Sequence, residues 1–365
     1  MKYFVLAGEA SGDKQAALLC EAIFSHDERA VMIGWGGEAM TATGVTVTRH
    51  YRDLAYMGFV EVIKHLPAIL RNFKKCKAEI LSFKPDGLVL VDYPGFNLRM
   101  ASWAYEQKIP VYYYISPQLW AWHTSRVHKI KKAVRRMYVI LPFEEAFYAK
   151  YGMKALYIGH PLAMNTPASS QTIHITKKRT IALLPGSRKH EVEKILPEMV
   201  KLAEKLPHYH FRIAAVSNLP LFLYEKIISD SENIVIIPDD MHSVLNESEA
   251  AIVTSGTATL ETALTGTPQV VVYKGNFFSY QIAKHLIKVP YISLVNLIAG
   301  EKLIPELIQS DCTGEQMRKN LLEILKPANY QKIQAGYKKV KDLLTTGGGA
   351  EAAALDIISD LGQIK

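Results

Sequence analysis

The chain has 365 residues, of which 49% are hydrophobic and 21% are charged, a composition that gives room for two folded domains and excludes general disorder. No apolar run approaches the roughly 18 residues that a membrane-spanning helix needs, and no signal-peptide pattern opens the chain, so we expect a cytoplasmic location. The net charge of +8 predicts an acidic partner: a nucleic acid, an anionic membrane surface or a phosphorylated substrate.

Short apolar runs alternate with longer helical patterns from the N-terminus onward. A strand is expected at residues 3–7 and a helix at 14–24. Further buried strands of the N-terminal half are expected at 31–33, 87–91, 111–115 and 138–141. This alternation predicts a parallel, doubly wound sheet.

The turn between the first strand and helix, residues 8–13, is rich in small residues. It fits an ordinary turn in which Ser11 or Asp13 caps the helix, and it also fits a loop that binds an anion or an acceptor. Glu9 is unusual in an anion-binding loop because its carboxylate repels anions. It would suit holding a sugar hydroxyl or acting as a base.

Residues 57–77 have an amphipathic helical pattern, interrupted by Pro67, which should kink or break the helix. The apolar positions are Phe59, Val62, Ile63, Leu66, Ile69, Leu70 and Phe73. The basic flank consists of Lys64, Arg71, Lys74, Lys75 and Lys77. Both a membrane-surface helix and a core-packed helix with a solvated face fit this pattern, and the pattern alone favours the core.

Asp92 follows the buried strand expected at 87–91. A lone aspartate after a strand is more often a turn or cap residue. Its place at the same sheet edge as the 8–13 turn favours a functional role, since a carboxylate there can accept a proton from an attacking hydroxyl. Farther along, residues 126–136 are strongly basic with only a narrow apolar stripe, which indicates a basic surface.

The polar segment 161–178 has no periodicity and is expected to be a linker. The strand pattern then restarts, with strands expected at 180–184, 211–216, 233–237, 250–253 and 269–273. We therefore predict two Rossmann-like, doubly wound domains facing a cleft, which is the architecture of one large class of glycosyltransferases. The expected domains are 1–165 and 175–345. They are followed by a C-terminal helix within 346–365 that packs on the first domain or on a partner chain.

Two junctions of the second domain are typical of phosphate-binding loops. Pro-Gly-Ser-Arg ends the strand at 180–184, so Ser187 and Arg188 precede a helix whose first turn contains Glu191. Free N–H groups at a helix start and a guanidinium can both hold a diphosphate; the alternative for Arg188 is an ordinary surface arginine. Ser255, Gly256 and Thr257 open a second helix, on which Glu261 could accept ribose hydroxyls or simply be exposed.

Neither the histidines nor the cysteines are spaced as metal ligands or as a disulfide framework. We therefore expect no metal site, and no cofactor is indicated. The run 112–114 has three tyrosines that could stack on bases, but it is typical of a buried strand and no RNA-binding motif accompanies it, so nucleic acid is not an expected partner.

Seven segments in order resemble the lipid-A-disaccharide synthase family over essentially the whole chain. They are residues 7–13, 57–62, 116–122, 141–144, 184–188, 255–261 and 296–300, which read AGEASGD, MGFVEV, SPQLWAW, LPFE, LPGSR, SGTATLE and NLIAG. Each segment alone is weakly specific, whereas seven in order are hard to obtain by chance.

The resemblance implies a GT-B fold. It also implies an inverting, metal-independent glycosyltransferase that joins UDP-2,3-diacylglucosamine to 2,3-diacylglucosamine 1-phosphate through a β-1,6 bond. It places Asp92 at the family's candidate catalytic aspartate and Arg188, Glu261 and Asn296 at nucleotide-binding positions. Gly95 stands where the family often has a second aspartate. The resemblance also implies that segment 57–77 docks on the inner face of the inner membrane, which reverses the preference for a core helix there.

Three other functions fit the same residues. They are another GT-B transferase with a soluble acceptor, a UDP-sugar epimerase, and a non-catalytic nucleotide-binding protein. An epimerase would not need the apolar and basic segment at 57–77, so binding to lipid vesicles separates it from the transferase that the resemblance implies.

Overall fold

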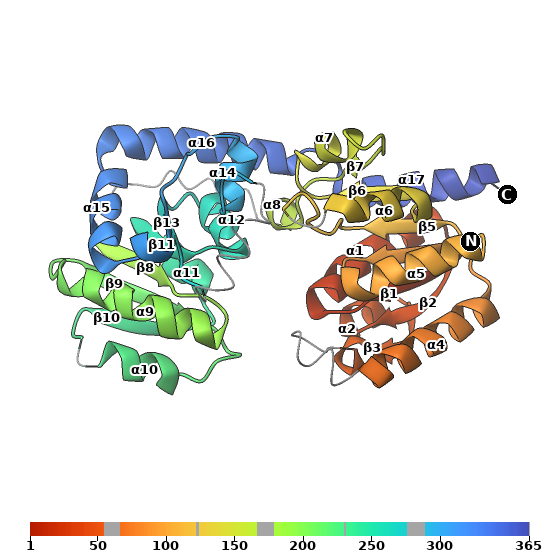
Figure 1. Cartoon of the computed structure of the whole chain (residues 1–365), viewed down its shortest axis with the longest axis horizontal. Coiled ribbons are helices and arrows are strands. Elements are labelled where there is room, and N and C mark those ends of the chain that lie inside the picture. The colour runs from red at the N-terminus through yellow and green to blue at the C-terminus, as the bar shows by residue number, and fades with distance from the viewer. Residues whose placement is uncertain (55–65, 122–123, 166–178, 230, 276–288, 365) are drawn as a thin grey trace. The chain divides into compact units, whose positions relative to one another are not determined.

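The computed structural model describes residues 1–54, 66–121, 124–165, 179–229, 231–275 and 289–364 (Figure 1). The chain divides into two compact units. Unit 1 comprises residues 1–164 and 344–365, and unit 2 comprises residues 165–343. The C-terminal segment therefore returns to the unit in which the chain begins.

Unit 1 contains a seven-stranded parallel sheet in the order β3-β2-β1-β4-β5-β6-β7. The strands are β1 (Lys2–Ala7), β2 (Val31–Gly36), β3 (Thr46–His50), β4 (Gly87–Val91), β5 (Val111–Tyr114), β6 (Arg136–Val139) and β7 (Leu156–Tyr157). The predicted doubly wound sheet is confirmed. The strand at 138–141 was placed two residues too late, and β3 and β7 were missed.

Helices cover both faces of this sheet, and two buried clusters of apolar side chains lie between the layers. The helices are α1 (Ala10–His26), α2 (Glu38–Ala42), α4 (Leu66–Phe83), α5 (Pro94–Glu106), α6 (Val127–Ala133), α7 (Glu144–Ala149), α8 (Pro161–Asn165) and α17 (Gly349–Ile364). Short 3-10 turns occur at Tyr51–Asp53 and Thr124–Arg126. The linker expected at 161–178 is wrong at its start, where α8 forms; residues 166–178 lie outside the described part.

Helix α17 packs against α1 and is tied to the sheet by buried polar contacts. Asp360, whose side chain is 1% exposed, accepts a hydrogen bond of 2.7 Å from the Tyr112 hydroxyl. It also pairs with Arg135 and, at 2.7 Å, with Arg136. The apolar side of α17 is buried through residues such as Ile357 and Leu361. The C-terminal helix is thus an integral layer of unit 1.

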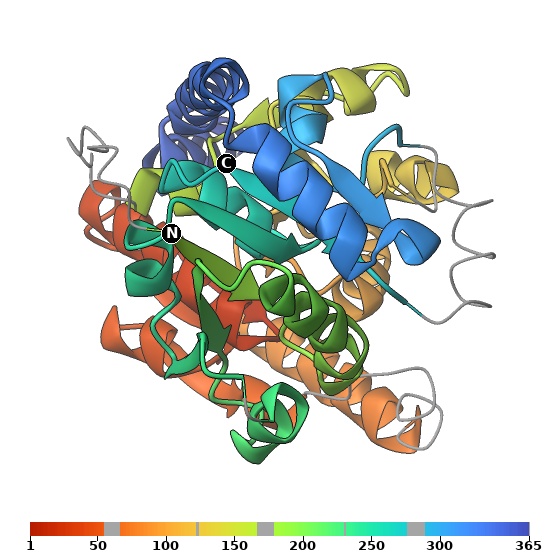
Figure 2. The ribbon, with the colours of Figure 1, turned by 90° about the vertical axis from the view of Figure 1, so that its left-hand side faces the viewer.

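Unit 2 contains a six-stranded parallel sheet in the order β10-β9-β8-β11-β12-β13. Its strands are β8 (Thr180–Leu184), β9 (His210–Ala215), β10 (Ile234–Pro238), β11 (Ala250–Thr254), β12 (Gln269–Tyr273) and β13 (Glu306–Ile308). Its helices are α9 (Lys189–Glu204), α10 (Phe222–Ile228), α11 (Met241–Asn246), α12 (Thr257–Leu264), α14 (Leu294–Ala299), α15 (Gly314–Ile324) and α16 (Pro327–Thr345). Another 3-10 turn covers Gln309–Asp311. Helices α9 and α15 pack together on one face of the sheet (Figure 2).

Both sheets reverse their strand order at one place. In unit 1 the chain winds outward from β1 in one direction and from β4 in the other, and in unit 2 it does so from β8 and β11. Ligands of such open sheets bind beyond the C-terminal strand ends at this switch point. The residues that follow β1, β4, β8 and β11 are therefore the first place to look for function.

Candidate active site

The predicted site residues of unit 1 follow the two strands at its switch point. Glu9 comes two residues after β1, and Asp92 directly follows β4, the strand paired with β1. Both side chains are half-buried. Burial, reinforced by the neighbouring Glu9 carboxylate and opposed by a hydrogen bond with the Tyr93 backbone, raises the pKa of Asp92 to about 6. The structure thus brings two carboxylates close together, and Asp92, with its raised pKa, is the one that suits a general base near neutral pH.

The backbone that bears Asp92 has an uncommon conformation. Asp92 and Tyr93 both have left-handed backbone angles, with φ of 45° and 46°. Such angles in residues other than glycine cost on the order of 1–3 kcal/mol each. The Asp92 carbonyl accepts hydrogen bonds from the Tyr113 hydroxyl at 2.7 Å and from Asn97 Nδ2 at 2.8 Å. These two side chains hold the turn in its strained form and so fix the place of Asp92.

Gly8 is required beside this turn because the ring of Tyr93 lies directly against it. A Cβ added at Gly8 would come within 2.2 Å of that ring. The Tyr93 hydroxyl in turn donates a hydrogen bond of 3.0 Å to the Leu54 carbonyl. The small residue in the 8–13 turn therefore permits contact between the turns that follow β1 and β4.

Asp13 caps a helix, but a different one from the helix expected. Its buried carboxylate accepts hydrogen bonds from the backbone N–H groups of Gly37 (2.6 Å), Ala39 (3.0 Å) and Met40 (3.3 Å), at the start of α2. Helix α1 begins after Glu9 without a side-chain cap, and Ser11 is exposed. The alternative in which Ser11 or Asp13 caps α1 is thus wrong, because Asp13 faces the turn after β2.

The buried carboxylate of Glu144 joins residues 141–144 to the loop that contains Trp120. It accepts hydrogen bonds from the Leu141 N–H at 3.0 Å and from the Trp120 indole at 3.2 Å. Burial raises the pKa of Glu144 to about 7 despite these bonds. The Leu-Pro-Phe-Glu segment therefore fixes the loop that contains Trp120.

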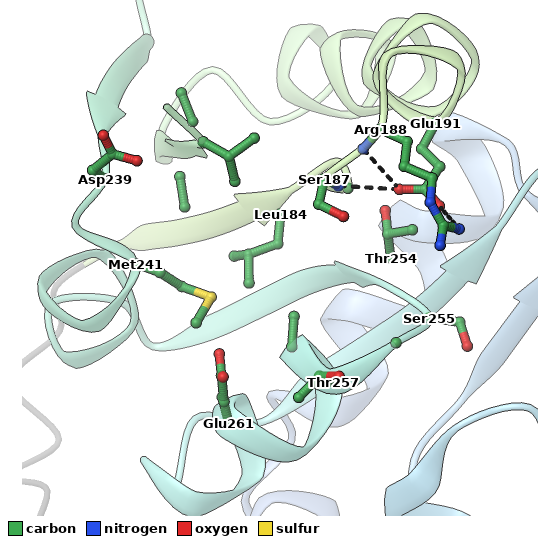
Figure 3. Close-up of a pocket in the computed structure, with 16 residues that line it drawn as sticks. Leu184, Ser187, Arg188, Glu191, Asp239, Met241, Thr254, Ser255, Thr257 and Glu261 are labelled. Atoms are coloured by element: carbon green, nitrogen blue, oxygen red, sulfur yellow. Dashed lines mark hydrogen bonds and ion pairs between the residues drawn. The ribbon is translucent and has the colours of Figure 1, made fainter. Parts of the chain in front are cut away.

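In unit 2 a cavity of about 490 Å³ lies at the switch point (Figure 3). Its lining includes six of the seven residues proposed to bind the donor nucleotide, namely Ser187, Arg188, Ser255, Gly256, Thr257 and Glu261. They come from the starts of α9 and α12, which follow the paired strands β8 and β11. The sequence therefore located this pocket from two short junctions about seventy residues apart.

The two helix starts at this cavity differ in what their N–H groups contact. At α9, Glu191 Oε2 accepts hydrogen bonds from the N–H groups of Ser187 (3.0 Å) and Arg188 (3.2 Å), as the dashed lines in Figure 3 show. Gly186, with φ of 115°, lies so close that a Cβ there would be 2.5 Å from the same oxygen. Helix α12 starts after Gly256 with no side-chain cap. The N–H groups of Ser187 and Arg188 are therefore not available to a ligand, because Glu191 already binds them, whereas the start of α12 has no such side-chain acceptor.

Two polar side chains at the cavity have no protein partner among the described residues. The hydroxyl of Thr254 is buried and makes no hydrogen bond. Glu261 is half-buried, its carboxylate has no hydrogen-bond or ion-pair partner among the described residues, and burial raises its pKa. Buried polar groups are usually satisfied, so both are available to a ligand. The Arg188 side chain is 73% exposed and within 3.4 Å of Glu191, at the rim of the cavity.

The nucleotide-binding assignment of Asn296 is not supported by its surroundings. Asn296 is fully buried and does not line the cavity. Its Nδ2 donates to Ile304 O (3.0 Å) and Glu306 Oε1 (2.9 Å), and its Oδ1 accepts from the N–H groups of Leu303 and Ile304. These bonds use the full capacity of a side-chain amide. Asn296 shapes the turn between α14 and β13 and has no group left for a nucleotide.

Only part of the segment expected to contact the acceptor or the membrane lies within the described residues. Phe59, Ile63 and Lys64 lie outside them, as does the side chain of Leu66. Helix α4 starts at Leu66, so Pro67 lies in its first turn, where proline is tolerated. The membrane assignment of Phe73 is wrong: its ring lies 4.1 Å from that of Phe96, centroid to centroid, and packs on the core. Arg71 is exposed on the opposite side.

Several residues at these sites were missed. Thr254 was overlooked because the strand expected at 250–253 ended one residue too early. Asp239 and Met241, which follow the C-terminal end of β10, also line the cavity and were not predicted. Asn97 and Tyr113 were not recognised as supports of Asp92, since backbone strain has no signature in a single sequence. Glu191 was recognised only as an acidic residue in the first turn of a helix. A glutamate at that position is the signal from which its capping of the helix start could have been predicted.

Within the described ranges, no group of three or more histidine, cysteine or acidic side chains could hold a metal ion. No described helix is long and apolar enough to cross a membrane.

Known proteins resemble this chain along its full length. The family model for lipid-A-disaccharide synthetase matches residues 3–354. The lipid-A-disaccharide synthase of Geobacter sulfurreducens is 36% identical over 99% of this chain and 98% of its own. That of Syntrophus aciditrophicus is 39% identical over 96% of this chain and 95% of its own.

Solved structures show the same fold at low sequence identity. The glycotransferase of kitacinnamycin has a TM-score of 0.66 at 13% identity and covers 99% of this chain and 98% of its own. The UDP-GlcNAc 2-epimerase of Neisseria meningitidis bound to UDP-GlcNAc has a TM-score of 0.59 at 13% identity, with full coverage of both chains. The predicted GT-B fold is confirmed by these neighbours, which include both glycosyltransferases and epimerases.

Proposed function

Since the chain belongs to the lipid-A-disaccharide synthetase family and is a glycosyltransferase of lipid A biosynthesis, we propose that it transfers 2,3-diacylglucosamine from UDP to 2,3-diacylglucosamine 1-phosphate. The linkage formed is β-1,6, and UDP is released. One observation carries the assignment of roles: Asp92, with its raised pKa, follows a strand at the switch point of unit 1. The nucleotide-sized cavity lies at the switch point of unit 2.

The cavity of unit 2 takes the UDP portion of the donor. The diphosphate lies at the open start of α12, near Thr257, where uncapped N–H groups and the positive end of the helix dipole favour an anion. Arg188 at the rim swings from Glu191 onto the diphosphate and stabilises charge on the leaving group. Glu261, half-buried and without a described partner, accepts the ribose hydroxyls.

Asp92 acts as the general base. With a pKa of about 6 it is mostly ionised at neutral pH and still takes a proton readily. It removes the proton from the 6-hydroxyl of the acceptor while that oxygen attacks the anomeric carbon on the face opposite UDP. The bond from that carbon to the UDP oxygen breaks, so the α-linked donor gives a β-linked product in a single displacement.

The acyl chains of both substrates require contact with a bilayer, and we assign this contact to the exposed face of α4. Leu70 is 57% exposed there, and Arg71, Lys74 and Lys75 are exposed beside it. An apolar side chain among cations suits an anionic leaflet, here the inner face of the inner membrane. This face replaces Phe73 as the described part of the docking surface.

The test is to incubate the purified protein with the two acylated sugars in the presence of EDTA. Release of UDP together with a β-1,6-linked disaccharide monophosphate supports the assignment. An epimerised UDP-sugar without a disaccharide identifies an epimerase instead. Loss of activity in EDTA that magnesium restores would contradict the proposed neutralisation of the diphosphate by Arg188 and α12.

A further inference from the structure

Thr254 is the last residue of β11, and its side chain interrupts the apolar pattern of that strand. Residues 250–253, which precede it, are all buried and apolar. Thr254 is only 4% exposed, yet its hydroxyl has no hydrogen-bond partner in the described part of the chain. Leaving a buried hydroxyl unpaired destabilises a fold, whereas an apolar side chain of the same shape does not. The hydroxyl at this position therefore calls for an explanation outside the fold.

The other polar side chains that line the nucleotide cavity differ from Thr254. Asp239 accepts a hydrogen bond from the Ser217 N–H at 2.7 Å, and Ser255 donates one to the Ile292 carbonyl at 3.1 Å. The remaining polar side chains of the lining are exposed or half-buried, so water can satisfy them. Among the described lining residues, Thr254 is thus the one whose buried polar group is left to a ligand.

The Thr254 hydroxyl can turn into the cavity at little cost. Its oxygen is covered by neighbouring atoms, but rotation about the Cα–Cβ bond exchanges the hydroxyl with the methyl group between staggered positions. That rotation breaks no hydrogen bond with a described residue. An oxygen of a ligand in the cavity can therefore become its acceptor.

Thr254 lies between the two helix starts that meet at this cavity. Strand β11 pairs with β8, the strand that leads to α9, and α12 begins three residues after Thr254. Figure 3 shows Thr254 between Arg188 and Thr257. Glu261, the proposed ribose contact, lies about one turn farther along α12 than Thr257. A nucleotide that runs from Glu261 toward the start of α12 therefore brings its outer phosphate toward Arg188 and Thr254.

We propose that the Thr254 hydroxyl donates a hydrogen bond to the β-phosphate of the donor, the phosphate that is bonded to the sugar. The proposal rests on the glycosyl transfer proposed above, in which UDP is the leaving group. When the bond between the anomeric carbon and the phosphate oxygen breaks, its electron pair stays on that oxygen, and negative charge grows on the β-phosphate. A hydroxyl donor beside Arg188 stabilises this charge.

Calorimetric titration of Thr254→Val with UDP and with UMP tests this contact, because UMP lacks the β-phosphate. UDP should bind the variant roughly tenfold more weakly than the wild type, the effect of one hydrogen bond to a charged group. UMP should bind the two proteins alike. An unchanged UDP affinity would overturn the proposal. An equal loss of UMP affinity would overturn it too, since the hydroxyl would then contact another part of the nucleotide.

Thermal unfolding without nucleotide separates a contact with the ligand from a contact within the fold. Thr254→Val removes an unpaired buried hydroxyl and should unfold at the wild-type temperature or above it. Thr254→Ser keeps the hydroxyl but loses a buried methyl group, so it should be less stable while its UDP affinity stays near that of the wild type. The reverse pattern, a destabilised Thr254→Val and a Thr254→Ser that binds UDP weakly, would overturn the proposal.

A second pair of variants guards against repacking around the valine. Thr254→Ala and Thr254→Ser differ only in the hydroxyl, and neither adds bulk to the strand end. Thr254→Ala should bind UDP roughly tenfold more weakly than Thr254→Ser, and the two should bind UMP alike. Equal UDP affinities in this pair would overturn the proposal even where Thr254→Val folds poorly.

The assay with the two acylated sugars keeps this contact apart from the proposed reaction. A wild type that makes no disaccharide, together with a selective loss of UDP affinity in Thr254→Val, would reject the proposed function and keep the contact with the β-phosphate. Disaccharide formation by the wild type, together with an unchanged UDP affinity in Thr254→Val, would overturn the contact alone.

Discussion

At the scale of single residues, Asp92, the proposed base, combines three features that oppose folding. Its backbone is left-handed, its carboxylate is half-buried, and Glu9 adds a second negative charge nearby. Each feature opposes folding, and each is expected at a catalytic position. The surrounding side chains, Asn97 and Tyr113, compensate by binding the Asp92 carbonyl.

We therefore predict that Asp92→Asn is more stable than the wild type above pH 6. The folded-state pKa of Asp92 is about 6, above its ordinary value of 3.8, so the ionised form is disfavoured in the folded protein. The protonated acid stabilises the fold below pH 4, and this contribution disappears as pH rises through 6. The variant should gain about 1–3 kcal/mol of unfolding free energy at pH 7.5 and nothing below pH 4.

Denaturant titrations at several pH values measure this gain. Asp53→Asn, which removes an exposed carboxylate from the same unit, is the matched control and should change stability little. A destabilised Asp92→Asn at pH 7.5 would contradict the strained, charge-burying site described here.

Glu9→Gln should shift the acidic limb of the rate profile. Removing the Glu9 charge lowers the pKa of Asp92, so the limb in kcat/KM near pH 6 should move to lower pH by some tenths of a unit to one unit, while the plateau rate is largely kept. The control is Glu21→Gln, which removes a carboxylate from an exposed position on α1 and should leave the profile in place. A collapse of the plateau rate would show that Glu9 takes a direct part in proton transfer.

The sequence predicted correctly that Asp92 and Arg188 lie just beyond strand ends and that Glu261 lies on the helix after β11. These positions follow from the strand pattern, whereas the roles of the three residues stay predictions. Asn296 and Phe73 were misassigned. The Asn296 side chain is saturated by the turn that contains Leu303 and Ile304, and Phe73 packs on Phe96; neither contact has a signature in the sequence pattern.

At the scale of elements, the most consequential contact is the attachment of α17 to unit 1. Asp360→Ala leaves Tyr112, Arg135 and Arg136 without their common acceptor. The two arginine side chains are 39% and 41% exposed, and solvent screens their share of the loss. We expect a loss of about 2 kcal/mol in unfolding free energy.

Thermal and denaturant unfolding measure this loss, with Glu351→Ala as the control on the same helix. Glu351 is 54% exposed and pairs only with His26 among described residues, so its removal should cost well under 1 kcal/mol. Equal losses in the two variants would contradict the role assigned to Asp360.

The elements that the sequence failed to predict share a physical cause. The strands β3 and β7 lie at the edges of their sheet, as does β13 in unit 2, and all three are short or polar. Edge strands bury less surface than central ones, so their apolar pattern is weak. The central strands β4, β8 and β11 are continuous apolar runs, and their positions were predicted closely.

At the scale of the whole molecule, attachment to a bilayer should depend on α4. Arg71→Gln combined with Lys74→Gln should weaken binding to phosphatidylglycerol vesicles by about 2 kcal/mol at low salt, on the order of 1 kcal/mol for each cation. Lys338→Gln with Lys339→Gln removes the same charge from exposed positions on α16 and is the control. Equal release by the two double variants would show that only net charge, and no particular face, attracts the protein to lipid.

The most direct test of the account is the turnover of Asp92→Asn with both acylated sugars, measured beside its affinity for UDP. Asparagine keeps the size and much of the hydrogen bonding of aspartate, but it cannot take a proton. We predict that kcat falls by about 10²–10⁴-fold, while UDP binds to the variant as to the wild type, because the nucleotide cavity is built from unit 2 alone. A variant that still forms the disaccharide at near wild-type rate would contradict the assignment of Asp92 as the base.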